Sequence, residues 1–121
     1  MSRRAEPTDE ELDAIRPLCS SSVTYHEDGW RQVIRMKGLR FPEQGQHREM
    51  DALLVLNHDN PTYPTKLYLA EQIGCGLNWN ESHYILGQEW YTFSWANVPN
   101  HLLPIEILAD HLVPLKLGKA A

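Results

Sequence analysis

One cysteine of the chain lies in a setting that could support nucleophilic chemistry. Cys75 stands between Gly74 and Gly76 in the stretch IGCGLNWN, and the two glycines would let a peptide approach the backbone closely. A thiol attacks as its thiolate, so this role needs cationic or amide-rich surroundings that lower the pKa of the thiol from about 8.5. Free cysteines are also among the most commonly buried residues. Two hypotheses therefore stand for Cys75: a nucleophile, or a small apolar residue in a glycine-bounded turn.

Three polar side chains follow Cys75 and could complete a catalytic site. Asn78 and Asn80 carry amide donors of the kind that stabilise an oxyanion. His83 could accept the proton of an attacking lysine, because the ordinary pKa of histidine lies near neutrality. If Cys75 is the nucleophile, the predicted catalytic set is Cys75, Asn78, Asn80 and His83.

The other cysteine and the other histidines give weaker signals. Cys19 closely follows Pro17 at the expected end of a helix, and we predict that it is packed rather than reactive. His58 and Asp59 could form an acid–base pair, but Asn, Asp and Pro at this point are also typical of a turn. The spacing of the cysteines and histidines matches no zinc module. We therefore predict no metal and no cofactor.

The composition is that of one globular domain without a nucleic-acid partner. The chain has 121 residues, of which 42% are hydrophobic, so we predict a single domain over residues 1–121. The net charge of −5 argues against nucleic acid, because phosphate binding needs a basic face. One basic cluster is present, and we interpret it as a solvated strand face. Its members are Arg31, Arg35, Lys37, Arg40 and Arg48.

No stretch of the sequence predicts a membrane segment. The longest unbroken apolar run, residues 52–56, is too short to span a bilayer. The first residues, MSRRAEPTDEE, lack the apolar run of a signal peptide. Two cysteines make no disulfide framework and are interpreted as reduced. These features predict a cytoplasmic protein that does not bind membranes.

The first element expected along the chain is a short helix. Thr8 and Glu11 have the spacing of a capping box, in which each side chain bonds the backbone N–H of the other residue. Pro17 lacks an N–H and disfavours a helical residue before it, so the helix should end near Arg16.

A β-hairpin is expected next. Residues 22–26 are rich in strand formers, and residues 30–36 alternate, with Arg31 and Arg35 on one side and apolar side chains on the other. The Asp28-Gly29 pair between these runs is a strong hairpin signal. The two runs should therefore be antiparallel neighbours.

Two more strands are expected before the middle of the chain. Residues 38–49 contain proline and glycine and are interpreted as a loop. Residues 50–56 are apolar on both faces, as a strand in the middle of a sheet would be. Residues 57–64 have a turn-forming composition, and residues 65–70 follow as a fourth strand.

The remaining chain predicts an irregular segment and a second helix. Residues 71–97 show no sustained period and concentrate the aromatic residues. Trp79, in a polar context, is the ring expected to be most exposed. Pro104 suits the first turn of a helix, which Pro114 should end, leaving a frayed tail. Packing is the expected role of most of the other rings, among them Trp90, Phe93 and Trp95.

This order of elements resembles the ubiquitin-conjugating enzyme fold. Tyr63-Pro64 stands between the third and fourth strands, where that family has a Tyr-Pro turn, and Trp95 and Pro99 precede the last helix as in the family. Bacterial ubiquitin-conjugating-like proteins are also similar in Phe41-Pro42 and in the run GQEWYTFSW at residues 87–95. The resemblance implies an α+β fold with an N-terminal helix, a four-stranded antiparallel meander, a long irregular aromatic segment and a C-terminal helix.

The resemblance implies a carrier of a ubiquitin-like modifier. Such a transferase accepts the modifier from an activating enzyme as a cysteine thioester, here on Cys75, and passes it to an amine. The chain lacks the His-Pro-Asn tripeptide of these enzymes, and their cysteine position falls near Gly87, downstream of Cys75. The alternative is a non-catalytic module of the same fold that binds an activating enzyme or a ubiquitin-like protein. The predicted partner-binding residues are Tyr63, Pro64 and Trp79.

Overall fold

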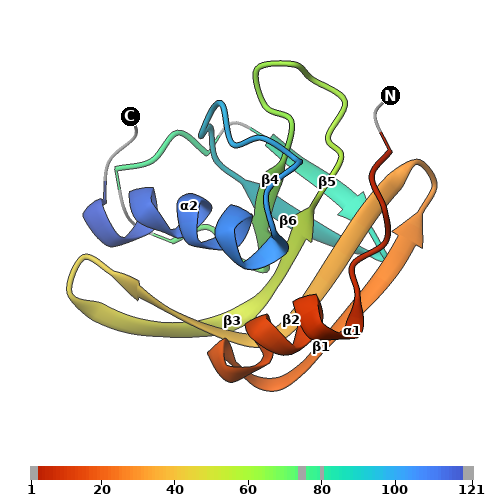
Figure 1. Ribbon diagram of the computed structural model, residues 1–121. Helices are drawn as coiled ribbons and strands as arrows, with labels where there is room; N and C mark the ends of the chain where they lie inside the picture. Colours follow the sequence, from red (N-terminus) through yellow and green to blue (C-terminus); the bar gives the residue numbers. More distant parts are fainter. Residues whose placement is uncertain (1–2, 74–75, 80, 119–121) are drawn as a thin grey trace.

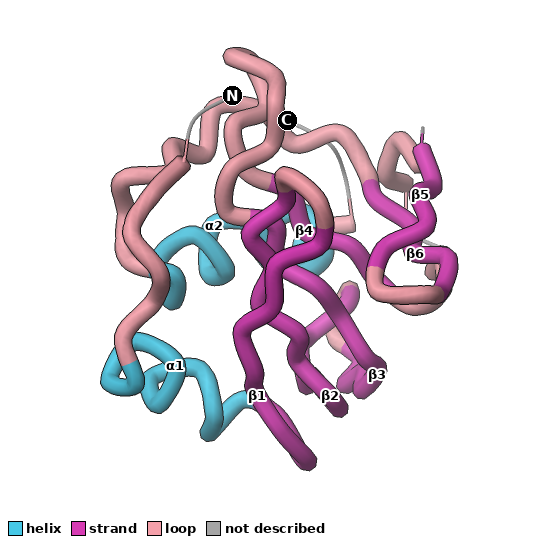
Figure 2. The backbone as a smooth tube through the Cα atoms, turned by 90° about the vertical axis from the view of Figure 1, so that its right-hand side faces the viewer, coloured by secondary structure: helices cyan, strands magenta, loops and turns pink. Residues whose placement is uncertain are grey.

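The described residues of the chain fold into two α-helices and one antiparallel sheet. The computed structural model describes residues 3–73, 76–79 and 81–118. In Figure 1 both helices lie in front of the sheet, and Figure 2 shows the same layers from the side. The elements are α1 (Asp9–Ile15), a 3₁₀ turn (Arg16–Leu18), β1 (Cys19–Asp28), β2 (Arg31–Glu43), β3 (Gln46–Val55), β4 (Lys66–Leu69), β5 (Glu81–Ile85), β6 (Gln88–Thr92) and α2 (Pro104–Leu117).

The sheet has six strands in the order β1-β2-β3-β4-β6-β5. The first four are neighbours in chain order, as expected, but the prediction of a four-stranded sheet is wrong. The β5–β6 hairpin lies within the segment predicted to be irregular, and β6 pairs with β4. Its turn has positive φ at Leu86 (52°) and Gly87 (81°). Leucine rarely adopts such a φ, so Leu86-Gly87 is not a pair from which a hairpin would be predicted.

The first helix begins and ends close to the predicted residues. The hydroxyl of Thr8 accepts from the N–H of Glu11 at 3.1 Å, and the carboxylate of Glu11 accepts from the N–H of Thr8 at 2.8 Å. These two bonds satisfy N–H groups that a helix start leaves without partners. Leu12 and Ile15 are buried against the sheet. The capping-box prediction is confirmed.

Both hairpins of the first three strands are tight. Asp28 pairs with Arg31, so the predicted first hairpin is confirmed, with Gly29 (φ 60°) in its turn. The loop predicted over residues 38–49 is wrong, because β2 and β3 continue through it to a turn at Gln44 and Gly45. Pro42 fits in β2 because β1 pairs only as far as Leu39, which leaves that side of the strand without a partner.

The second helix starts at Pro104 as predicted but continues past Pro114, so the predicted end is wrong. An interior proline costs a helix about 3 kcal/mol, and burial of Pro114 and Leu115 offsets this cost. Gly118 ends the helix in the left-handed conformation (φ 72°), and its N–H donates to the carbonyl of Pro114 at 2.7 Å. No helix in the described part of the chain is long and apolar enough to cross a bilayer.

The sheet carries a hydrophobic cluster on each face. The larger one lies between the sheet and the two helices, and it includes Ile34, Leu54 and Leu108. The face turned away from the helices, called here the far face, carries the smaller cluster. Its buried members are Val33, Leu53, Val55, Tyr68, Ile85 and Trp90.

The far face is covered by curling of the sheet. The carboxylate of Asp28, at the end of β1, accepts from the N–H of Leu86 in the β5–β6 turn at 2.7 Å. Since β1 and β5 are the two edge strands, this bond brings opposite ends of the sheet together. Trp90 is fully buried inside the curl, and its indole N–H donates to the carbonyl of Ile85 at 3.0 Å.

An N-terminal arm closes the molecule beside α2. The guanidinium of Arg4 donates to the carbonyls of Asn100 (3.0 Å) and Leu102 (3.1 Å). The backbone of Arg4 also exchanges two hydrogen bonds with the side-chain amide of Gln32. These bonds hold in place the segments that lead into α1 and α2.

Candidate functional site

The predicted catalytic residues are not gathered by the part of the chain that the structure describes. Cys75 and Asn80 lie outside the described residues. Asn78 is exposed, and its side-chain amide donates to the hydroxyl of Ser94 at 3.4 Å. His83 contacts a different set of residues on the far face. The two described members, Asn78 and His83, therefore have separate partners.

His83 lies between Tyr68 and Glu81. The hydroxyl of Tyr68 lies 3.0 Å from Nδ1 of His83, and Nε2 of His83 lies 3.4 Å from the carboxylate of Glu81. Burial raises the pKa of Tyr68 to about 12, so its hydroxyl keeps its proton near neutral pH. Nε2 of His83 faces the carboxylate of Glu81. The imidazole is thus held by two partners instead of facing an attacking amine.

The residue after Cys75 lies at the C-terminal end of α2. The N–H of Gly76 donates to the carbonyl of Gly118 at 3.2 Å. A Cβ atom at Gly76 would lie 2.9 Å from that carbonyl oxygen, which explains glycine at this position. A helix C-terminus carries partial negative charge, and negative charge disfavours a thiolate. The described neighbourhood of Gly76 therefore supplies no helix dipole that would activate a thiol.

Trp79 is half-buried and not the exposed ring that was expected. It packs edge-on against Phe93 with ring centroids 5.3 Å apart, on the helix-covered side of the sheet. Cys19 is buried as predicted, and burial raises the pKa of its thiol. The most exposed aromatic side chain of the described residues is Tyr84. The polar neighbours of Trp79 in the sequence therefore did not predict its exposure.

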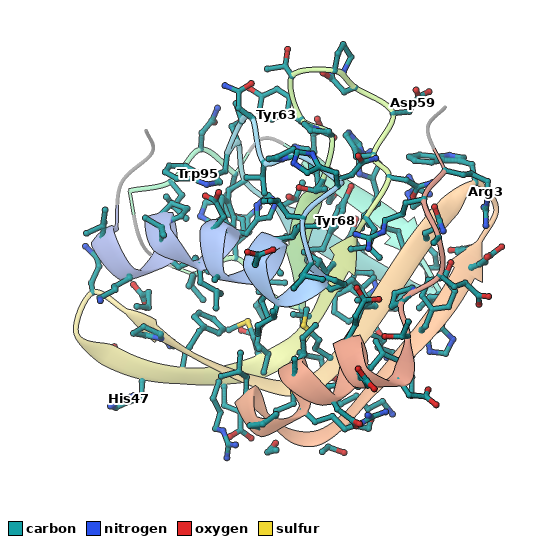
Figure 3. The ribbon with its side chains drawn as sticks, viewed as in Figure 1. Arg3, His47, Asp59, Tyr63, Tyr68 and Trp95 are labelled. Atoms are coloured by element: carbon teal, nitrogen blue, oxygen red, sulfur yellow. The ribbon has the colours of Figure 1, made fainter. Side chains whose placement is uncertain are left out.

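The Tyr63-Pro64 turn is anchored to the segment that leads into α2. The N–H of Asn97 donates to the carbonyl of Thr62 at 2.8 Å, and the N–H of His58 donates to the carbonyl of Pro64 at 2.9 Å. Figure 3 shows Tyr63 and Asp59 in this loop, away from the two helices. The turn is therefore fixed on both sides, and Tyr63 is half-buried.

A buried histidine holds the next residue of the same loop. The hydroxyl of Thr65 donates to the carbonyl of Val98 at 2.9 Å, so it accepts from Nε2 of His111, also at 2.9 Å. Burial, together with the charge of Lys66, lowers the pKa of His111 to about 3. His111 is therefore neutral near pH 7 and acts as a structural donor in the core.

Three basic side chains lie close together at the start of β2, in the loop after β3 and at the start of β4. We call them the cationic cluster: Arg31, His58 and Lys66. The guanidinium of Arg31 stacks on Trp30 at 4.7 Å, and the rings of Trp30 and His58 are 6.1 Å apart. Lys66 is only 3% exposed, and its ammonium lies 4.8 Å from the ring centroid of Tyr63.

The cationic cluster corrects the prediction of a solvated basic face. Arg31 and Arg35 lie on the far face, and each has a buried Nε without a hydrogen-bond partner among the described residues. Lys37 and Arg40 are exposed as expected. Strand alternation placed Arg31 and Arg35 on one face, but it could not show that the β5–β6 hairpin covers that face.

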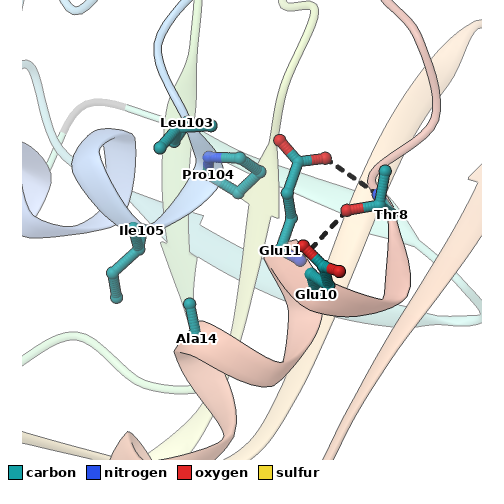
Figure 4. Close-up of a pocket in the computed structure, with 7 residues that line it drawn as sticks. All are labelled: Thr8, Glu10, Glu11, Ala14, Leu103, Pro104 and Ile105. Carbon is teal, nitrogen blue, oxygen red and sulfur yellow. Dashed lines mark hydrogen bonds between the residues drawn. The ribbon is translucent and has the colours of Figure 1, made fainter.

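A pocket of about 240 Å³ opens between the first turns of the two helices (Figure 4). We call it the interhelix pocket. The carboxylates of Glu10 and Glu11 come from α1, and Leu103 at the N-cap of α2 is 51% exposed. An acidic wall therefore faces an apolar one. The lining residues are Thr8, Glu10, Glu11, Ala14, Leu103, Pro104 and Ile105.

The chain was compared with protein-family models, curated proteins and solved structures, and none of them matches it.

Proposed function

We propose that the protein is a non-catalytic interaction module that binds a basic, partly apolar segment of a partner protein in the interhelix pocket. Following the resemblance of the sequence to ubiquitin-conjugating-like proteins, the partner is an activating enzyme or a ubiquitin-like protein. The pocket is the observation that carries this proposal, because it joins acidic side chains to an exposed leucine.

The charges around α1 favour a basic partner. The first turn of α1 contains Asp9, Glu10 and Glu11, and its last turn contains no basic residue. Glu11 is engaged in the capping box, so Asp9 and Glu10 are the carboxylates left for a partner. Lysine or arginine on the partner would complement them, while an apolar side chain would cover Leu103.

The arrangement of the predicted catalytic residues is the second support. In a thioester carrier these polar side chains would act together, whereas among the described residues His83 contacts Tyr68 and Glu81, and Asn78 contacts Ser94. A module that only binds its partner has no such requirement.

A matched pair of substitutions on α2 tests the proposal. Leu103→Ser removes the exposed side chain and leaves a good N-cap residue, so the helix is retained. Val113→Ser removes another exposed side chain of the same helix, 41% exposed and outside the pocket lining. Calorimetry would measure the binding of a ubiquitin-like protein and of an activating enzyme to each variant. Leu103→Ser should weaken binding by about tenfold or more, since burying a leucine contributes about 1.5–3 kcal/mol. Val113→Ser should leave binding unchanged.

A second measurement distinguishes the module from a thioester carrier. The protein is incubated with both partners and ATP, and its mass is measured with and without reductant. The module gains no mass. A reductant-sensitive adduct that disappears in Cys75→Ala would instead establish the carrier and contradict our proposal.

A further inference from the structure

The cationic cluster contains polar atoms that no described residue satisfies. Nε of Arg31 and Nδ1 of His58 are buried and have no hydrogen-bond partner among the residues described. The ammonium of Lys66 makes neither a hydrogen bond nor an ion pair within the same part of the chain. The face of the Tyr63 ring attracts the ammonium charge of Lys66, but it does not accept a conventional hydrogen bond from the N–H groups. Buried polar groups normally have partners, so the cluster lacks acceptors.

The surrounding carboxylates do not supply these acceptors. Asp28 is opposite Arg31 in the strand register, but its carboxylate accepts from the N–H of Leu86. Glu81 lies closest to His83, and it forms no ion pair with Lys66. Neither Arg31 nor Lys66 is paired with a carboxylate of the described residues. The positive charge of the cluster is therefore only partly balanced, in a chain whose net charge is −5.

The three groups are held close to one another by different elements. Val55, at the end of β3, pairs with both Val33 and Lys66, which places the start of β4 beside the start of β2. His58 follows three residues after Val55 and is held by the carbonyl of Pro64. Burial and the charge of Lys66 lower the pKa of His58, the charge of Glu81 partly opposes this, and the charges of His83 and Arg31 lower the pKa further. An anion among these groups would relieve this repulsion.

We propose that Arg31, His58 and Lys66 form a binding site for the phosphate group of a small ligand. A guanidinium and an ammonium are the side chains that proteins most often use for phosphate, and an imidazole adds a third donor. Trp30 and Tyr63 flank the cluster and present ring faces beside it. The site is separate from the interhelix pocket, so it is an additional property and does not depend on the proposed partner.

The test measures thermal unfolding of the whole chain in inorganic phosphate and in chloride at equal ionic strength. The wild-type protein should show a phosphate-dependent rise in Tm, and its backbone amides near residues 31, 58 and 66 should shift in NMR spectra. Lys66→Met keeps the length of the side chain and removes the charge, so it should bind phosphate at least about tenfold more weakly, the effect of one lost charged hydrogen bond. Lys66→Arg should retain binding.

Two controls separate binding from folding. Lys37→Met removes an exposed lysine of β2 and should keep the full response to phosphate. In chloride, Lys66→Met should have a Tm at least equal to that of the wild type, because it removes a buried charge. The proposal is overturned if phosphate has no more effect than chloride on the wild type. It is also overturned if Lys66→Met, folded by its NMR spectrum, responds as the wild type does.

Discussion

Acidification should destabilise the protein through His111. This side chain is 2% exposed, and burial with the charge of Lys66 lowers its pKa from 6.5 to about 3. Between pH 6.5 and about pH 3, the side chain of His111 binds a proton in the unfolded chain but not in the folded chain. Stability is therefore complete above pH 6.5 and falls as the pH drops toward 3, by about 1.4 kcal/mol for each pH unit. At pH 5, about 1.5 units below 6.5, the expected loss is about 2 kcal/mol.

Urea unfolding at pH 7.5 and pH 5 measures this loss, and His111→Gln isolates it. The side-chain amide of glutamine can replace the Nε2–H that Thr65 accepts, but it does not titrate. Other groups that titrate in this range, such as His58, are present in both proteins and cancel in the comparison. The wild type should lose about 2 kcal/mol more than His111→Gln between the two pH values.

Two results would refute this reasoning. One is an equal loss of stability in the wild type and in His111→Gln. The other is an NMR titration in which the His111 ring of the folded protein takes up its proton near pH 6.5. Either result would mean that the imidazolium is accommodated in the core.

Two further predictions concern stability at neutral pH, and both are measured by urea unfolding. Thr8→Ala removes half of the capping box and should cost about 1 kcal/mol, whereas Thr8→Ser keeps the hydroxyl and should cost little. Asp28→Ala breaks the bond between the two ends of the sheet and should cost about 1.5–3 kcal/mol. Asp28→Asn retains an acceptor and should lose less. Equal losses in either matched pair would contradict the role assigned to that hydrogen bond.

The elements that the sequence predicted correctly depend on local interactions. The capping box of Thr8 and Glu11 joins residues three apart, and the first hairpin depends on one glycine between two strands. The central strand was predictable because residues 52–56 are apolar on both sides. Such features are visible in any short window of sequence.

The errors arise where distant segments decide the structure. Strand β4 has four residues and β6 has five, and they pair only because the chain between them returns to the sheet edge. Arg31 and Arg35 are half-buried with buried Nε atoms, although the sequence indicated solvated side chains. Helix α2 continues beyond Pro114 because the ring of this proline is buried in the core. The helical spacing of apolar residues alone could not indicate this burial.

The candidate sites show the same difference between features set by local sequence and features set by distant segments. Glu10 and Glu11 were predicted as part of a helix start, but no local pattern indicates that Leu103 lines the same pocket. The sequence predicted that Lys66 lies in a strand. The proximity of His58 and Arg31 to Lys66 could not be predicted, because it depends on how β2, β3 and β4 are arranged. His83 was chosen for its chemistry, and its partners Tyr68 and Glu81 follow from the strand order β4-β6-β5.

The contacts of Arg4 join segments that lie far apart in the chain. Its backbone bonds the side chain of Gln32, while its guanidinium bonds the carbonyls of Asn100 and Leu102. Loss of the guanidinium alone would therefore release the segment that leads into α2 and leave the contact between the N-terminal arm and β2 in place.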